Sequence, residues 1–263
     1  MGNFFNFSQF NEITTVAFMN PQQKFASANF SDALSISHTP MIYNAIFPSD
    51  PRDIYGEPLT NVNFNGVCEG QKQMTEVAFY EQGGFKTEAP NINMISATGA
   101  FRNCSSLIGP PFKQPDSLRS IDSMYEECRS LTGEAQIGRN VHNLSAAYKN
   151  CSSLTSVNYT LNTTTWSESH ILNINYAFAN CGALQGTFDI SNYGRVCSRV
   201  DGIETCFQGT QLTGMVVKGK SKDISSWKNS LAAIEISNDN GVITYRVDDP
   251  NKGGPNLKII VVP

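Results

Sequence analysis

The chain has 263 residues, 40% of them hydrophobic, which is enough material for one large domain or two small ones. Only 16% of the residues are charged, against roughly 25% in an average globular domain, whereas 26 residues are Asn. Because Asn favours turns, this composition disfavours a helical bundle and favours strands and loops. The net charge of −4 and the lack of a long basic run disfavour binding to nucleic acid.

Residues 1–90 are rich in Phe and show no repeat. They contain no export signal, which would be a basic stretch followed by an apolar one, and no run of about 18 apolar residues. We therefore expect synthesis in a cytoplasm and no membrane insertion. Short strands are predicted at 5–7 and 14–18. Two interpretations stay open: the segment caps the repeats that follow, or its Phe-rich start is a docking arm for a neighbouring subunit. The docking-arm residues are Phe4, Phe5, Phe7 and Phe10.

Residues 91–217 contain a recurring motif: Ala or Met, then Phe or Tyr, two variable residues, Cys, two variable residues and Leu. The clear copies begin at Ala100, Met124, Ala147 and Ala177. A weaker fifth copy has Thr210 at the Cys position. An apolar residue precedes each small residue by three positions, and this spacing is typical of one face of a short helix. The Leu then begins a predicted strand, for example at 154–157, 184–188 and 212–217.

One such helix and strand cannot bury its own apolar face, so we expect about five turns to stack with their strands parallel. Equivalent side chains would then lie above one another in a shared core, with the cysteines as small buried thiols. The predicted repeat core consists of Phe101, Cys104, Leu107, Tyr125, Cys128, Leu131, Tyr148, Cys151, Leu154, Phe178, Cys181, Leu184, Phe207 and Leu212.

The motif resembles the BspA-like leucine-rich repeat, which also occurs in a mycoplasma lipoprotein repeat family. The resemblance implies an α/β solenoid over 91–217, flanked by a mostly-β N-terminal segment (1–90) and a C-terminal antiparallel β unit (218–263). It also implies binding, since the family supplies surface adhesins and interaction modules in bacteria and protists and turns up in proteins of tailed bacteriophages. The family has no catalytic residue to carry over.

Residues 218–263 read as a β-hairpin or meander that caps the repeats. Two strand-like runs, 231–236 and 242–247, flank an Asn-Gly step at Asn240, which is a strong hairpin signal. A third run follows at 257–262. The carboxylates of Asp248 and Asp249 precede Pro250 and are interpreted as turn residues.

No enzyme motif is present: the sequence has no Gly-x-Ser-x-Gly, no phosphate-binding Gly-rich loop and no His-Glu-x-x-His. The seven cysteines form no Cys-x-x-Cys pair, and no metal or cofactor site is expected.

We therefore expect a non-enzymatic virion protein of a tailed phage, in a tail fibre, baseplate or head fibre. Its partners would be other virion proteins and a host-surface receptor. A bacterial cell-surface adhesin and a glycan-binding or glycan-degrading protein are the alternatives. The expected partner face comprises Thr132, Thr155, Gln185 and Thr213, which follow the repeat Leu.

Overall fold

The computed structural model describes residues 12–17, 24–25, 29–35, 41–48, 50–53, 55, 57–81, 84–86, 92–159, 172–191, 200–218, 228–229, 231–247, 249 and 257–263. The strands are β1 (Glu12–Ala17), β2 (Lys24–Phe25), β3 (Met41–Pro48), β4 (Arg52–Asp53), β5 (Val62–Asn63), β6 (Glu76–Glu81), β7 (Gly84–Lys86), β8 (Met94–Ser96), β9 (Gly133–Ile137), β10 (Leu154–Tyr159), β11 (Leu172–Asn173), β12 (Gln185–Asp189), β13 (Val200–Asp201), β14 (Gln211–Lys218), β15 (Ala233–Asp239), β16 (Val242–Val247) and β17 (Lys258–Val262). Among the described residues, helix is confined to short segments such as α1 (Ile203–Cys206).

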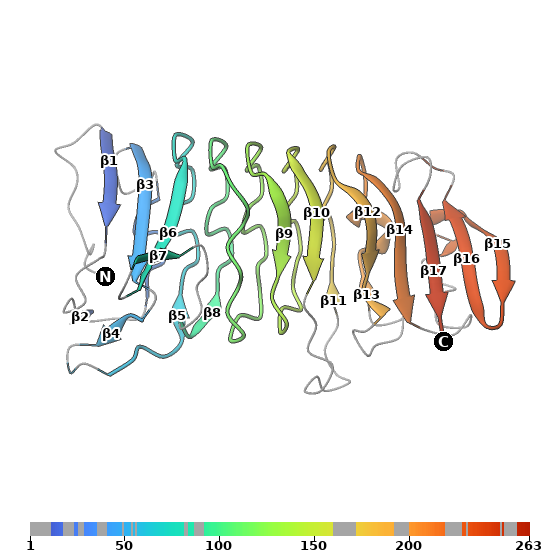
Figure 1. The fold of residues 1–263 in the computed structure, drawn as a ribbon, viewed down its shortest axis with the longest axis horizontal. Coiled ribbons are helices and arrows are strands. Elements are labelled where there is room, and N and C mark those ends of the chain that lie inside the picture. The colour runs from blue at the N-terminus through green and yellow to red at the C-terminus, as the bar shows by residue number, and fades with distance from the viewer. Residues whose placement is uncertain are drawn as a thin grey trace.

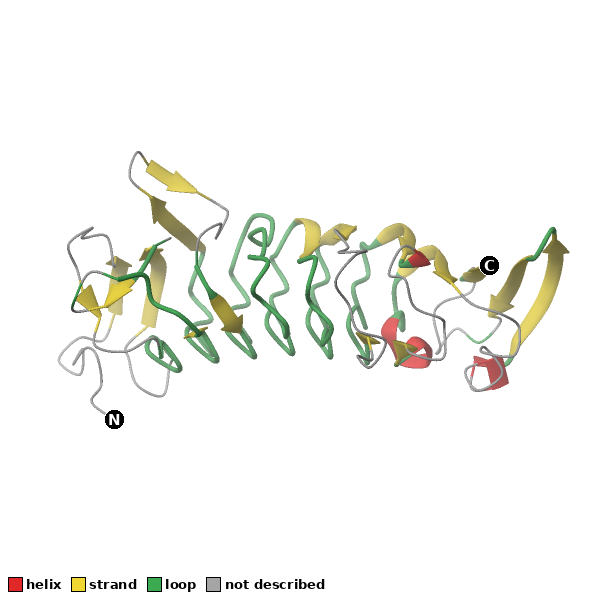
Figure 2. Cartoon of the chain, turned by 90° about the horizontal axis from the view of Figure 1, so that it is seen from below, coloured by secondary structure: helices red, strands yellow, loops and turns green. Residues whose placement is uncertain are grey.

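The molecule is long, and successive turns of the chain lie side by side along its long axis (Figure 1). The longer strands share one side, which we call the strand face; β1, β3 and β6 lie toward one end, β9 and β10 near the middle, and β12, β14, β17, β16 and β15 toward the other end. Viewed along the perpendicular direction, the middle of the molecule is a row of irregular turns with little regular secondary structure (Figure 2). Apolar side chains from all of these turns fill one continuous core.

The predicted α/β solenoid with helical repeat segments is wrong. The protein is mostly β, with several small separate sheets and a five-stranded mixed sheet at the C-terminal end. In the four clear copies, the segment predicted as helix is a non-helical turn. Two residues of each copy have left-handed backbone angles, which a right-handed helix excludes. These are Gly99 and Asn103, Ser123 and Glu127, Ala146 and Asn150, and Tyr176 and Asn180, with φ between +51° and +67°.

Hydrogen bonding shows why these turns stack. Alternate N–H groups bond within their own turn, as Cys104 N does to Phe101 O (3.1 Å). The others point along the long axis: Phe101 N donates to Met124 O and Asn103 N donates to Glu126 O, both at 2.8 Å. Each turn therefore depends on the next for half of its backbone bonds, so a single copy cannot satisfy its own polar groups. The predicted extended segments after the repeat Leu are present as β10, β12 and β14.

The ladder continues toward the N-terminus, past the expected start of the repeats at residue 91. Cys68 N donates to Ala100 O and Leu34 N donates to Val67 O, both at 2.8 Å. This places Cys68 at the aromatic position of a further turn and Gln71 at its Cys position. Ladder hydrogen bonds therefore cross from the predicted N-terminal segment into the predicted repeats without a break.

The C-terminal hairpin is confirmed: β15 and β16 pair antiparallel, and β16 pairs antiparallel with β17. Asn240 and Gly241 have φ of +52° and +85°, as a two-residue type I′ turn requires. β17 in turn pairs parallel with β14, so the meander extends the sheet of the stacked turns. The predicted strand at 14–18 corresponds to β1, whereas the one at 5–7 lies outside the described residues.

Candidate functional site

The repeat cysteines are buried, and their thiols help to hold successive turns together. The Sγ of Cys128, Cys151 and Cys181 lies 3.0 Å from the carbonyl oxygen of the aromatic residue in the preceding turn, to which the thiol donates. Desolvation raises the pKa of Cys104 and Cys181 to about 12, so these thiols stay protonated at neutral pH. A thiol that is protonated and buried is a poor nucleophile and a poor metal ligand. In the described part of the chain, no three His, Cys, Asp or Glu side chains lie close enough together to hold a metal ion.

The aromatic residues of the motif form a column beside the thiols. Ring centroids of successive turns lie 5.3 Å apart for Phe101 and Tyr125, 5.4 Å for Tyr125 and Tyr148, and 5.8 Å for Tyr148 and Phe178. All fourteen residues predicted for the repeat core are buried. Within this motif the described side chains therefore act in packing.

The residues expected on a partner face are exposed. Thr132, Thr155, Gln185 and Thr213 each follow a buried Leu and point to solvent on the strand face. The Oγ1 of Thr155 donates to the carbonyl of Gly133, and that of Thr213 donates to the carbonyl of Gly186, both at 3.2 Å. These bonds fix the hydroxyls against the neighbouring turn. The proposed docking-arm residues Phe4, Phe5, Phe7 and Phe10 lie outside the described residues.

The strand face has a gap between β6 and β9, which the sequence analysis did not single out. The turn that would fill it begins in register, because Ile108 N donates to Thr75 O and Thr132 N donates to Gly109 O, both at 3.1 Å. Pro110 and Pro111 follow, and proline has no N–H to continue a ladder. Hollows of about 390 Å³ and 460 Å³ lie on the two sides of these prolines.

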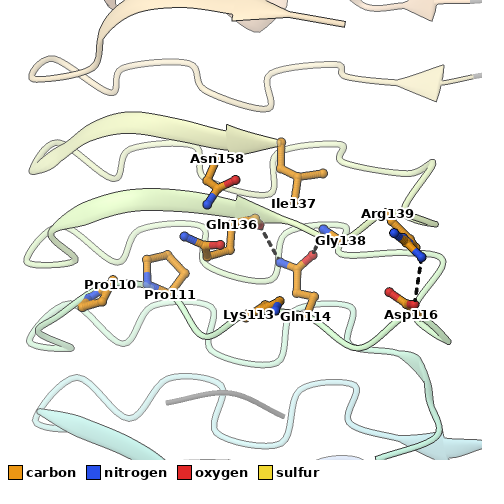
Figure 3. A pocket seen from close by; sticks show the side chains of 10 residues that line it. All are labelled: Pro110, Pro111, Lys113, Gln114, Asp116, Gln136, Ile137, Gly138, Arg139 and Asn158. Carbon is orange, nitrogen blue, oxygen red and sulfur yellow. Dashed lines mark hydrogen bonds and ion pairs between the residues drawn. The ribbon is translucent and has the colours of Figure 1, made fainter. Parts of the chain in front are cut away.

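We call the smaller one the polar hollow; it lies between Pro110, Pro111 and the edge of β9 (Figure 3). The side chain of Gln114 is buried and replaces the missing strand there: its Nε2 donates to Gln136 O at 2.7 Å and its Oε1 accepts from Gly138 N at 2.8 Å. The rim carries charged and amide side chains: Lys113, Asp116, Gln136, Arg139 and Asn158. This wall is therefore rigid, and its rim offers both donors and acceptors.

The larger one, the apolar hollow, lies between β6 and the segment 108–112. Leu107, Phe112 and Leu131 contribute to its wall, and Ile108 at its edge is 62% exposed. The ring of Tyr125 also lines it, and the Tyr125 hydroxyl has no partner with hydrogen-bond geometry among the described residues. Burial raises the pKa of this phenol well above its ordinary value, although a backbone group of Phe112 lowers it in part. The hydroxyl therefore lies near the backbone of Phe112, although the contact lacks the geometry of a hydrogen bond.

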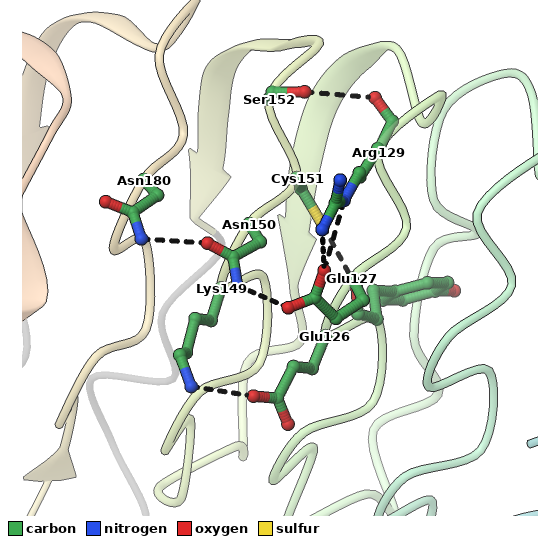
Figure 4. A network of polar contacts seen from close by, with 9 residues as sticks. Glu126, Glu127, Arg129, Lys149, Asn150, Cys151, Ser152 and Asn180 are labelled. Carbon is green, nitrogen blue, oxygen red and sulfur yellow. Dashed lines mark hydrogen bonds and ion pairs between the residues drawn. The ribbon is translucent and has the colours of Figure 1, made fainter.

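A network of polar contacts joins the turns on a different part of the surface (Figure 4). Lys149 Nζ lies 2.9 Å from Glu126 Oε1, and Asn150 Nδ2 donates to Glu127 Oε1 at 2.6 Å. Asn180 continues the row by donating to Asn150 Oδ1 at 2.8 Å. Burial is the largest single effect on the Glu127 carboxyl and favours a higher pKa, but the hydrogen bonds from Arg129 and Asn150 together lower the pKa below its ordinary value. Arg129 and Glu127 belong to the same turn, but the other contacts join neighbouring turns, so the network reinforces the stacking register.

Comparison of the chain with protein-family models, curated proteins and solved structures gives no match. The resemblance to BspA-like repeats therefore stays a prediction. None of the helices in the described residues is long and apolar enough to span a membrane.

Proposed function

We propose that the chain is a non-enzymatic interaction protein that presents its strand face to a partner protein inside a larger assembly, such as the virion of a tailed phage. One observation carries the proposal: the exposed row of Thr132, Thr155, Gln185 and Thr213 stands at fixed intervals on the same face as the two hollows. The reactive side chains of the motif, in contrast, are buried thiols.

The turns hold this row rigidly. Stacked turns share backbone bonds and one core, and within the pairs β9–β10 and β12–β14 the side chains keep the strand spacing of about 4.8 Å. Such preorganisation lowers the entropy lost when a partner binds. The virion setting is supported by the repeat resemblance and by the low charge of the chain.

Co-sedimentation with particles tests the proposal. Particles are purified on density gradients from cells that carry the gene, and the chain is detected with an antibody. We expect the natural chain to sediment with the particles. The double variant Thr155→Lys with Gln185→Lys should stay in the light fractions, since two bulky charges would stand in the contact.

The matched control is Ile234→Lys with Asn238→Lys, which adds the same charge on the exposed strand β15 and should leave sedimentation unchanged. A natural chain that never sediments with particles contradicts the virion setting. If that chain instead binds intact host cells, the adhesin alternative gains. Specific binding on a glycan array would favour the glycan-binding alternative.

A further inference from the structure

We propose that Asn240 is a site of spontaneous covalent modification, at which the backbone nitrogen of Gly241 attacks the side-chain amide of Asn240 and the amide becomes a carboxylate. The chain contains two Asn-Gly steps, Asn65-Gly66 and Asn240-Gly241. The sequence alone makes the two steps equivalent, whereas the structure holds the first and exposes the second. This inference goes beyond the proposed function and does not depend on it.

The reaction needs water and no other molecule. The Gly241 nitrogen gives up its proton and bonds to Cγ of Asn240, and the side-chain nitrogen takes up a proton and leaves as ammonia. The product is a five-membered cyclic imide. Water then opens one of the two carbonyl groups of the imide, which gives either aspartate or isoaspartate. One water is consumed and one ammonia is released, with no oxidation or reduction. Glycine favours the attack because it has no Cβ to obstruct the ring.

The step Asn65-Gly66 is held by the next turn of the stack. Gly66 N, which would be the attacking atom, donates to Thr98 O at 2.9 Å. The Oδ1 of Asn65 accepts from Thr98 N at 2.9 Å and from Ser96 Oγ at 2.6 Å. Gly66 is also buried. Attack at this step would break all three hydrogen bonds and leave polar groups unpaired inside the stack, which is costly.

The step Asn240-Gly241 has none of these restraints. It forms the exposed turn between β15 and β16, the outer pair of the C-terminal sheet (Figure 1). Neither the Asn240 side chain nor Gly241 N has a hydrogen bond within the described part of the chain. Apart from chain neighbours, no heavy atom lies within 4 Å of the place that a Cβ of Gly241 would take. Rotation of the turn toward the ring geometry disturbs only the last pair of the ladder, Asp239 with Val242.

The two products change the hairpin differently. Aspartate keeps the main chain as it is, and Asp-Gly is itself a preferred pair in this type of turn. Isoaspartate lengthens the main chain by one methylene group, which displaces Asp239 from Val242 in the two-residue turn. Both products add a negative charge beside β15, which already carries Glu235 and Asp239. The modification therefore alters the C-terminal end of the sheet slowly and leaves the repeat core intact.

Peptide mapping by mass spectrometry tests the proposal. The folded full chain is kept at mildly alkaline pH, samples are digested at intervals, and the gain in mass on replacement of NH2 by OH is followed at both steps. We expect Asn240 to be converted at least about tenfold faster than Asn65, because only attack at Asn65 breaks three hydrogen bonds. In guanidinium chloride, which unfolds the chain, the two residues should be converted at similar rates.

Variants assign the released ammonia to the turn. Asn240→Gln should remove most of the ammonia released by the folded chain, since the longer side chain would have to form a less favourable six-membered ring. The matched control Asn238→Gln alters an exposed Asn of β15 that precedes Asp239, and it should leave the release unchanged.

The proposal is refuted if Asn240 keeps its amide in the folded chain, or if it is converted less than about tenfold faster than Asn65 there. It is also refuted if the unfolded chain shows the same preference as the folded one, since the local sequence and not the fold would then decide. None of these results bears on the co-sedimentation test of the proposed function.

Discussion

Replacing Tyr125 and Tyr148 separately with Phe tests how the column of aromatic rings is held. The two rings are stacked with an interplanar angle of 11°, so the loss of either hydroxyl leaves the ring packing unchanged. The hydroxyls differ in their surroundings. That of Tyr148 donates to Gln136 O, whereas that of Tyr125 lies near the backbone of Phe112 and has no partner with hydrogen-bond geometry among the described residues.

This difference sets the sign and size of the two effects. Tyr148→Phe removes one hydrogen bond, worth about 1 kcal/mol net, and Gln136 O keeps the bond from Gln114 Nε2 at 2.7 Å. Tyr125→Phe removes a buried hydroxyl whose lost hydration costs about 1–3 kcal/mol, so the variant should be as stable as the natural chain or more stable by about 1 kcal/mol. The two variants should therefore differ by about 1–2 kcal/mol.

Urea unfolding followed by far-UV circular dichroism measures the difference. The slope with urea should be the same for both variants, because the surface exposed on unfolding is the same, so the midpoints report the change in stability. Equal losses in the two variants would refute the reasoning, and so would a greater loss in Tyr125→Phe. Either result would mean that the Tyr125 hydroxyl has a partner as good as that of Tyr148.

Three further predictions concern the backbone and the thiols. Ala146→Gly should stabilise the chain by about 0.5–1 kcal/mol in thermal unfolding, because Ala146 has φ of +51°; in a helix the same change would cost about 1 kcal/mol. Gly202→Ala should lower the free energy of unfolding by at least about 2 kcal/mol, since a Cβ there would overlap the backbone of Asn175. The urea midpoint should be constant from about pH 6 to 8 and fall steeply from about pH 9 to 11. Burial raises the pKa of Cys104 and Cys181 from about 8.5 in the unfolded chain to about 12 in the folded chain. The stabilisation from each buried thiol is therefore complete below about pH 8.5. As the pH rises from there toward 12, the free energy of unfolding falls by about 1–2 kcal/mol per pH unit for each thiol.

Each of these has a distinct contrary result. A loss of stability in Ala146→Gly would support a helical repeat segment, and an unchanged melting temperature in Gly202→Ala would mean that the two turns are further apart. A urea midpoint that is the same at pH 7 and pH 10.5 would mean that the thiols are not shielded from water.

The core could be predicted from the sequence and the backbone conformation could not, for a definite reason. Equivalent residues such as Cys104, Cys128 and Cys151 recur in register, and this alone requires a shared buried position. The spacing of apolar residues, however, fits both a helix and a turn that alternates right- and left-handed residues. The sequence does contain the deciding signal: Asn stands two residues after the aromatic at Asn103 and Asn150, where φ is +63°.

The candidate site was harder to predict, because it arises where a strand is missing. The Pro110-Pro111 step indicates that the ladder stops, but the sequence does not say what the gap exposes. That depends on side chains from later turns, such as Gln136 and Asn158. The exposed Thr row, in contrast, follows from the repeat register and could be predicted.

The two ends of the thiol column show what the Cys position requires. Gln71 occupies it near the N-terminus and donates to Leu34 O at 2.9 Å, the bond that each cysteine makes to its preceding turn. Its Oε1 also accepts from Ile42 N at 2.9 Å, which ties this turn to β3 as no thiol could. At the other end, Thr210 is buried and donates to Phe207 O within its own turn. The position therefore selects for a buried donor that reaches a nearby carbonyl. Cysteine meets this need in the middle of the stack, and more polar donors replace it at the two ends of the thiol column.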